Sequence, residues 1–342
     1  MLKQTLAALT LSLASLSAHA ADEFKVCWSH YTGWEPWSYA QDSGILDKWA
    51  KKYDITIQLD LINDYIESIN LYTSGLYDAC TMTQMDALTI PAVGGVDSTA
   101  LILGDYSNGN DGIVIKQGSS VADLKGREVM LVELSVSHYL LARALDKNGL
   151  SEQDVKVVNT SDADIASLFQ AAPDANVVTW NPPLQQVTNT PNAKLVFDSS
   201  MIPGEILDLM VVKTQADERL KKALTGAWYE VMQQMAKGDD KALNAMASSA
   251  GGSLAEFNAQ LTTTNMFYQA EQAVAQMQDK QLIKTMEYVR SFSFDHGLYG
   301  NGAPSKDLVG ISFPDGSVLG DNNNIKLRFD ASYMQLAAEN KL

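Results

Sequence analysis

Basic residues are scarce in this sequence. Its 342 residues include 25 Lys and Arg against 41 Asp and Glu, a formal net charge of −16 at pH 7. Proteins that bind nucleic acid neutralise phosphates with a basic surface, and anionic membranes attract the same kind of surface. The composition therefore excludes both as partners. We expect most of the acids to keep the protein soluble and monomeric.

Long apolar runs are absent beyond the N-terminus. Lys3 precedes an apolar run over 6–16, broken only by Thr and Ser, and Ala18-His19-Ala20 has the small residues that signal peptidase requires. The run is shorter than the about 20 apolar residues that span a bilayer. We predict that residues 1–20 are a cleaved signal peptide and that the mature protein is periplasmic. No Cys directly follows the cleavage site, so no lipid anchor is expected.

Cysteine and histidine are also few. The sequence has two Cys and four His, and His30, His138 and His296 lack the spacing of a metal-ligand set. We expect no metal and no cofactor. Cys27 and Cys80 lie in strand-like runs that we expect to be neighbours, and two Cys in an exported protein can pair if their Cα atoms are within about 7 Å. Two buried free thiols are the alternative.

Short β-rich runs alternate with helical patterns, which is typical of parallel sheets with crossover helices. Removing 20 of the 342 residues leaves 322, more than one core usually holds, so two lobes are expected. The first unit has expected strands at 24–28, 55–61, 77–82, 99–103 and 112–116, and helices at 38–53, 65–74 and 84–93.

A second unit follows, and the chain then becomes helical. Strands are expected at 129–132, 155–158, 175–179, 195–197 and 209–212, and helices at 137–148, 163–171, 216–237, 241–249, 254–261, 270–277 and 281–296. Residues 316–324 are expected to be a loop before a final helix. The prediction is an α/β clamshell in which 21–113 and 209–342 form lobe 1, with a helical C-terminal extension, and 114–208 form lobe 2. Ligands of such sheets bind beyond the carboxyl ends of strands, so strand-to-helix turns should line the cleft.

At these turns the sequence resembles a known family. The segments that carry the resemblance are WSHYTGWEPW (28–37), TMTQMDAL (81–88), GNDG (109–112), VELSVSHY (132–139), TWNP (179–182) and SFSFDHGL (291–298). They resemble the nitrate/sulfonate/taurine group of periplasmic binding proteins, and most closely its urea carboxylase-associated branch. The resemblance implies a type II binding-protein fold, no catalysis, and delivery of a small molecule to the membrane permease of an ABC importer. It also implies a urea-like or guanidine-like ligand.

The pocket turns differ in charge from those of anion binders. They contain Glu35, Asp86, Asp111 and Glu133 but no Lys or Arg. Acids in the cleft repel sulfonates and nitrate, and favour a cation or a strong hydrogen-bond donor. Glu133 follows a strand and is expected to accept two N–H bonds from a guanidinium, with a role at the following helix N-terminus as the alternative. Asp86 and Asp111 have similar alternatives, a helix N-terminus and ordinary turn chemistry.

Aromatic residues are the other candidates for ligand contact. Trp34 and Trp37 flank a proline, and we expect one to face the ligand, with Trp34 favoured, and the other to pack in the core. Trp faces attract flat cations. Trp180 is expected to form the opposite wall, next to Asn181 as a polar contact.

Several smaller groups complete the predicted site. Thr81, Thr83 and Ser137 are expected to donate hydroxyl hydrogen bonds or to cap helices. Ser137 and His138 are adjacent on a helix and face different directions, so they do not predict a hydrolase. Glu205 and Asp208, near the second crossing between lobes, are expected to be solvated hinge charges.

Three classes of function are consistent with the fold. The favoured one is an importer-linked binding protein for guanidinium, with urea or a related amide or amidine next, because guanidinium has N–H donors and no good acceptor. A taurine- or sulfonate-like binder on the same fold is a variant of it. The second class is a pyrimidine-precursor type of enzyme, which would need a reactive His and a metal or cofactor site. The third is a sensor domain or assembly partner.

Overall fold

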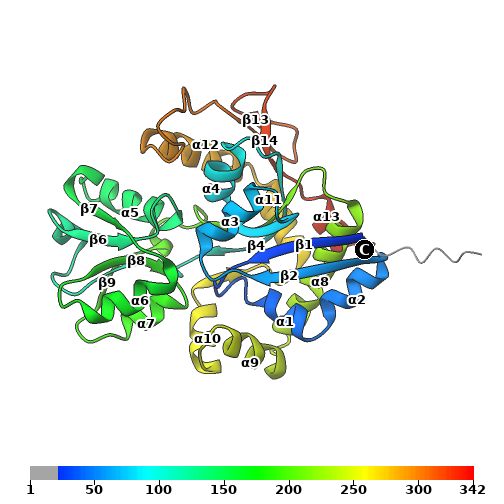
Figure 1. Ribbon diagram of the computed structural model, residues 1–342, viewed down its shortest axis with the longest axis horizontal. Helices are drawn as coiled ribbons and strands as arrows, with labels where there is room; N and C mark the ends of the chain where they lie inside the picture. The colour runs from blue at the N-terminus through cyan, green and yellow to red at the C-terminus, as the bar shows by residue number, and fades with distance from the viewer. Residues whose placement is uncertain (1–21) are drawn as a thin grey trace, which may run out of the picture.

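Two sheets divide the chain into two lobes (Figure 1). The computed structural model describes residues 22–342, so the predicted signal peptide lies outside the described residues. The larger sheet has the order β13-β12-β14-β4-β10-β3-β1-β2, with β11 paired to β4. Its strands are β1 (Asp22–Trp28), β2 (Ile55–Leu61), β3 (Ala79–Thr83), β4 (Ser98–Ser107), β10 (Leu207–Lys213), β11 (Thr264–Met266), β12 (Gly310–Ser312), β13 (Val318–Leu319) and β14 (Ile325–Phe329).

The smaller sheet belongs to the second lobe. Its order is β7-β6-β8-β5-β9, and its strands are β5 (Asp111–Ile115), β6 (Glu128–Leu131), β7 (Lys156–Asn159), β8 (Asn176–Trp180) and β9 (Lys194–Asp198). The helices around it are α5 (Val136–Lys147), α6 (Asp162–Ala171) and α7 (Pro183–Thr188). Figure 1 shows this lobe in green on the left.

The first lobe carries the remaining α-helices. They are α1 (Pro36–Asp42), α2 (Ile45–Lys52), α3 (Tyr65–Thr73), α4 (Gln84–Ala87), α8 (Glu218–Ala236), α9 (Asp240–Ser249), α10 (Leu254–Leu261), α11 (Ala270–Gln278), α12 (Lys280–Asp295) and α13 (Ser332–Ala338). The amphipathic α8 packs its buried face on α1 and α2. Within residues 22–342, none of the helices is both long and apolar enough to cross a membrane.

The chain crosses between the lobes twice. It leaves the first lobe between β4 and β5 and returns between β9 and β10. The two crossings are joined by a hydrogen bond of 2.6 Å between the hydroxyls of Ser107 and Ser199, both buried. Because β10 returns between β3 and β4 and is antiparallel to both, residues from distant parts of the sequence meet at this end of the sheet.

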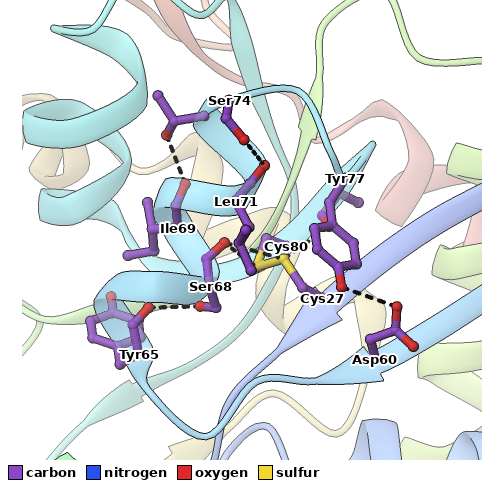
Figure 2. Close-up of a disulfide and its surroundings, with 11 residues drawn as sticks. Cys27, Asp60, Tyr65, Ser68, Ile69, Leu71, Ser74, Tyr77 and Cys80 are labelled. Atoms are coloured by element: carbon purple, nitrogen blue, oxygen red, sulfur yellow. Dashed lines mark hydrogen bonds between the residues drawn. A yellow bond between two sulfur atoms is a disulfide. The ribbon is translucent and has the colours of Figure 1, made fainter. Parts of the chain in front are cut away.

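A disulfide links two strands of the first lobe. Cys27 in β1 and Cys80 in β3 are directly paired in parallel register, with Cα atoms 4.5 Å apart, and their sulfur atoms are bonded (Figure 2). Both residues are completely buried. Of the two alternatives that the sequence left open, the structure therefore has the disulfide.

Two expectations about local structure are wrong. The single helix expected over 38–53 is two helices, because Gly44 adopts a left-handed conformation with φ of 76° and forms the N-cap of α2. The loop expected over 316–324 contains β13 and leads into β14, which pairs in parallel with β4 and extends the larger sheet. β13 pairs with β12, a few residues earlier in the chain, whereas β14 pairs with the distant β4, a partner for which the local sequence gives no signal.

Candidate ligand-binding site

A small, nearly closed cavity lies between the lobes. It is lined by Tyr31, Trp34, Tyr65, Thr83, Asp111, Val136, Trp180, Ile206 and Asp208. The first lobe and the returning crossing contribute most of these residues, and the second lobe contributes Asp111, Val136 and Trp180. A molecule in this cavity would therefore touch both lobes.

The lobes are closed over the cavity. The Trp180 indole Nε1 of the second lobe donates to the carbonyl oxygen of His30 in the first, at 3.2 Å. Further along the interface, the Gln260 side chain of α10 donates to Gln185 of α7 at 2.7 Å. The lining residues are almost completely buried, which removes most of the water from around any bound molecule.

Aromatic rings form the walls. The centroids of Trp34 and Tyr65 are 5.6 Å apart with an interplanar angle of 35°, and Tyr65 meets Trp180 edge-on at 5.4 Å. Trp37 does not line this cavity and packs on Trp228, with ring centroids 5.2 Å apart. The aromatic faces can attract a cation, and the attraction is strongest in a site shielded from water.

Two carboxyl groups line the cavity directly. Asp111 begins β5 and Asp208 lies in β10, and each is only 2% exposed. Oδ2 of Asp208 has no hydrogen-bond partner among the described residues. A buried carboxylate oxygen without a partner is costly, so this atom calls for a donor from a ligand.

Two further carboxyl groups lie behind the lining residues. Tyr65 donates its hydroxyl to Oδ2 of Asp86 at 2.6 Å, and Thr83 donates to the same oxygen at 2.9 Å. Tyr31 donates to Oδ1 of Asp105 at 2.8 Å. The hydroxyl groups of Tyr31, Tyr65 and Thr83 thus already donate hydrogen bonds to carboxyl groups of the protein and fix the positions of those carboxyl groups.

Burial dominates the electrostatics of these acids. Desolvation raises the pKa of Asp86, Asp105 and Asp111 to about 7, and it raises the pKa of Asp208 well above its usual range, with the charges of Asp105 and Asp111 adding to the effect. None of the nine lining residues is Lys, Arg or His. The side chains that line the cavity therefore include no basic group that could pair with an anion.

The structure brings four of the predicted site residues to the cavity. They are Trp34, Thr83, Asp111 and Trp180. Six others are buried nearby but do not line it: Glu35, Trp37, Thr81, Asp86, Ser137 and Asn181. Of these, Glu35 accepts a 2.7 Å hydrogen bond at Oε1 from the His30 ring.

Glu133 is not at the cavity. It is exposed, and its backbone N–H donates to the Asn159 side chain at 3.0 Å. Ser135 instead turns inward at the start of α5, accepting from the backbone N–H of Ser137 as the N-cap residue. The structure therefore does not place Glu133 where a ligand in this cavity would meet it, because the turn between β6 and α5 puts its side chain in solvent.

Other site residues escaped the sequence reasoning. Asp208 was expected to be a solvated hinge charge, but it is buried at the centre of the site. Asp105, Tyr31 and Tyr65 were not among the predicted residues. A signal for the two acids exists, since Asp105 follows the apolar run 101–103 and Asp208 stands between Leu207 and Leu209. A carboxylate inside an apolar strand is unusual unless it has a function or a partner.

The described residues offer no metal site: in 22–342 no group of three or more His, Cys, Asp and Glu side chains has suitable geometry.

Comparisons with known proteins place the architecture. A family described as NMT1/THI5 like matches residues 105–202. None of the curated proteins compared with the chain matches it.

Solved structures match over much more of the chain. The alkanesulfonate-binding protein SsuA from Xanthomonas axonopodis pv. citri, bound to MOPS, is 16% identical, with a TM-score of 0.68 over 83% of this chain and 95% of its own. The periplasmic aliphatic sulphonate binding protein SsuA from Escherichia coli is 15% identical, with a TM-score of 0.67 over 83% and 94%. The desulfurization enzyme DSZB is also similar, at 15% identity and a TM-score of 0.54 over 80% and 93%. These likenesses confirm the predicted fold class, the two-lobe α/β fold of periplasmic binding proteins.

Proposed function

We propose that this chain is the periplasmic solute-binding component of an ABC importer and that it captures guanidinium, with urea or a related amide or amidine as the next candidate. The observation that carries the proposal is the unpartnered, buried carboxylate oxygen of Asp208 in a closed cavity with aromatic walls. A small planar cation with N–H donors satisfies the carboxylate and the ring faces together. Membership of the urea carboxylase-associated branch stays a prediction.

Charge separates this site from a sulfonate site. The two sulfonate-binding proteins of similar fold are named for anionic ligands, but an anion in this cavity would face Asp111 and Asp208 with no basic side chain among the lining residues. The backbone N–H of Val136, at the start of α5, acts on the Asp86 carboxyl and lowers its pKa against the effect of burial. A protein carboxyl group thus uses the helix N-terminus that would otherwise attract an anion.

Hydrogen-bond donors separate guanidinium from urea. Urea has a carbonyl oxygen that needs a donor, whereas guanidinium has donors only. The hydroxyls of Tyr31, Tyr65 and Thr83 donate to carboxyl groups, and Trp180 donates to a backbone carbonyl. Among the side-chain donors of the described lining residues, this leaves the indole Nε1 of Trp34 without a partner. That single indole donor could serve the carbonyl oxygen of urea, but the two carboxyl groups that line the cavity call for N–H donors and positive charge, which favours guanidinium.

Ligand capture would close the two lobes. Because the cavity is lined from both lobes, a ligand bridges them and favours the closed arrangement by mass action. We expect the ligand-free protein to open at the crossings near Ser107 and Ser199, and the closed form to be the one that a membrane permease receives. Small-angle scattering with and without guanidinium tests this step.

Calorimetric titration with guanidinium, methylguanidine, urea, agmatine and taurine tests the ligand. We expect guanidinium to bind most tightly, agmatine to be excluded by its length, and taurine to give no heat. The variant Asp208→Asn should lose guanidinium binding, while Asp42→Asn, at an exposed position, should bind like the wild type. Binding of taurine but not guanidinium would refute the cationic ligand and favour a sulfonate-like one.

An enzyme is the second candidate. The NMT1/THI5-like match and the likeness to a desulfurization enzyme support it at the level of fold. No His lines the cavity, and His30 is engaged with Glu35. Recovery of the ligand chemically unchanged after long incubation with the protein would favour binding, and conversion of the ligand would favour catalysis.

A further inference from the structure

The acids around the cavity include a pair on neighbouring strands. Asp105 in β4 and Asp208 in β10 are opposite each other in antiparallel register, and both are buried. Oδ2 of each carboxyl group has no hydrogen-bond partner among the described residues, and burial, followed by the charge of Asp105, raises the pKa of Asp208. Since a carboxylate only accepts hydrogen bonds, neither group can satisfy the other unless one of them holds a proton. Two carboxyl groups so close together cannot both be charged at low cost.

The groups that face the pair do not neutralise it. The titratable groups that interact electrostatically with the pair are Tyr31, Asp111 and Tyr268, and Asp86 in turn interacts with Asp111. All of them are acids or phenols. Tyr31 is the donor to Asp105. No Lys, Arg or His is among them, so without a ligand the cluster can lower its charge only by holding protons. Accordingly, the pKa of Asp105 and of Asp111 is about 7, raised mainly by burial.

We infer that a cation entering the cavity takes the place of a proton held by the Asp105–Asp208 pair, so that the protein binds its ligand in exchange for a proton released to water. The inference rests on the proposed function, because it requires a cationic ligand. Asp208 is the member of the pair that lines the cavity, and its Oδ2 has no partner among the described residues. An N–H donor of the ligand can bond to this oxygen. The positive charge of the ligand then offsets the repulsion between the two carboxylates, so that the pair no longer needs the proton.

The size of the exchange follows from the acids involved. Groups that titrate near pH 7 are about half protonated there, and a cation in contact lowers a carboxyl pKa by about 1–3 pH units. Asp105 and Asp111 have pKa values of about 7, so we expect release of about one proton per cation at pH 7, and less above pH 8, where these two acids are already ionised. By linkage, affinity should rise about tenfold per pH unit around pH 7 and level off at higher pH.

Calorimetry of guanidinium binding in phosphate and in Tris at the same pH measures this exchange, because the two buffers differ in their heat of protonation. We expect the binding enthalpy at pH 7 to differ between them by the equivalent of about one proton. Binding with the same enthalpy in both buffers, and an affinity independent of pH from 6 to 8, would overturn the inference and leave the proposed function standing. No binding of guanidinium at any pH would overturn both.

Proton release measured on one variant of the pair and on one control variant tests whether the released proton comes from the pair. Asp105→Asn keeps the shape of a residue that does not line the cavity but removes the acid that shares the proton, so release should fall to about half or less. Asp42→Asn, at an exposed site, should release as many protons as the wild type. Undiminished release from Asp105→Asn would refute the role of the pair. If that variant does not fold, the pH series on the wild type still decides whether binding is coupled to proton release.

Discussion

Replacing Asp111 by Asn should stabilise the ligand-free protein at high pH while impairing its function. Asp111 is 2% exposed, and burial raises its pKa from 3.8 to about 7, with the charge of Asp86 adding to the effect. A group with a raised folded-state pKa binds its proton more tightly in the fold. The stability from that proton is fully present below about pH 4 and is lost as pH rises through about 7. At pH 8 the ionised carboxylate therefore weakens the fold, and neutral Asn does not.

The magnitude follows from linkage. A rise from 3.8 to about 7 is about three pH units, each worth about 1.4 kcal/mol, so the ionised group costs about 4 kcal/mol at pH 8. In a protein of this size about 2 °C of Tm corresponds to 1 kcal/mol, so Asp111→Asn should raise Tm by about 8 °C at pH 8 and by almost nothing at pH 4. The same variant should bind guanidinium more weakly by about 2–5 kcal/mol.

Differential scanning calorimetry at pH 4 and pH 8 measures these Tm differences. Asp42→Asn, at an exposed position, is the control and should leave the Tm unchanged at both pH values. A variant that is merely damaged would melt lower at both pH values. An equal Tm difference between Asp111→Asn and the wild type at the two pH values would show that the carboxyl group is not desolvated, and the reasoning about the cavity would be refuted.

Other substitutions test the walls, the turn and the disulfide. Trp180→Ala should weaken guanidinium binding and lower the free energy of unfolding less than Trp37→Ala, which should cost about 3–5 kcal/mol because Trp37 packs in the core. Calorimetric titration and urea denaturation of both variants distinguish the two positions, and the reverse pattern would exchange their roles. Glu133→Gln should bind guanidinium like the wild type, because Glu133 is exposed, and a large loss of affinity would return it to the site. Replacing Cys27 and Cys80 together by Ser opens a loop with a sequence separation of 53 residues, which should cost about 4 kcal/mol of unfolding free energy in urea titrations; an unchanged urea midpoint would refute a stabilising role.

Much of the architecture could be predicted because its signals are local. Alternating strand and helix patterns indicated an α/β fold in two lobes, and the fold class is confirmed. The turns after the strands pointed to Trp34, Asp111 and Trp180, which do line the cavity. The turns contain no basic residues, and the nine lining residues of the cavity likewise include no Lys, Arg or His, while the preference for a cation stays a prediction. In each case the relevant residues are close in sequence, or are joined by the general rule that ligands bind at the carboxyl ends of strands.

The tertiary structure alone decided how the acids are arranged. Asp105 and Asp208 are about a hundred residues apart in the sequence, and they meet only because β10 returns beside β4 in antiparallel register. Whether Asp208 is solvated or buried depends on that pairing and on closure of the second lobe, and neither has a local signal. Glu133 shows the converse, since a single turn before α5 sends its side chain to the surface. Composition and periodicity report which groups a chain contains, but the pKa and the function of a carboxyl group depend on its distance from other charges and from water, which only the packed chain determines.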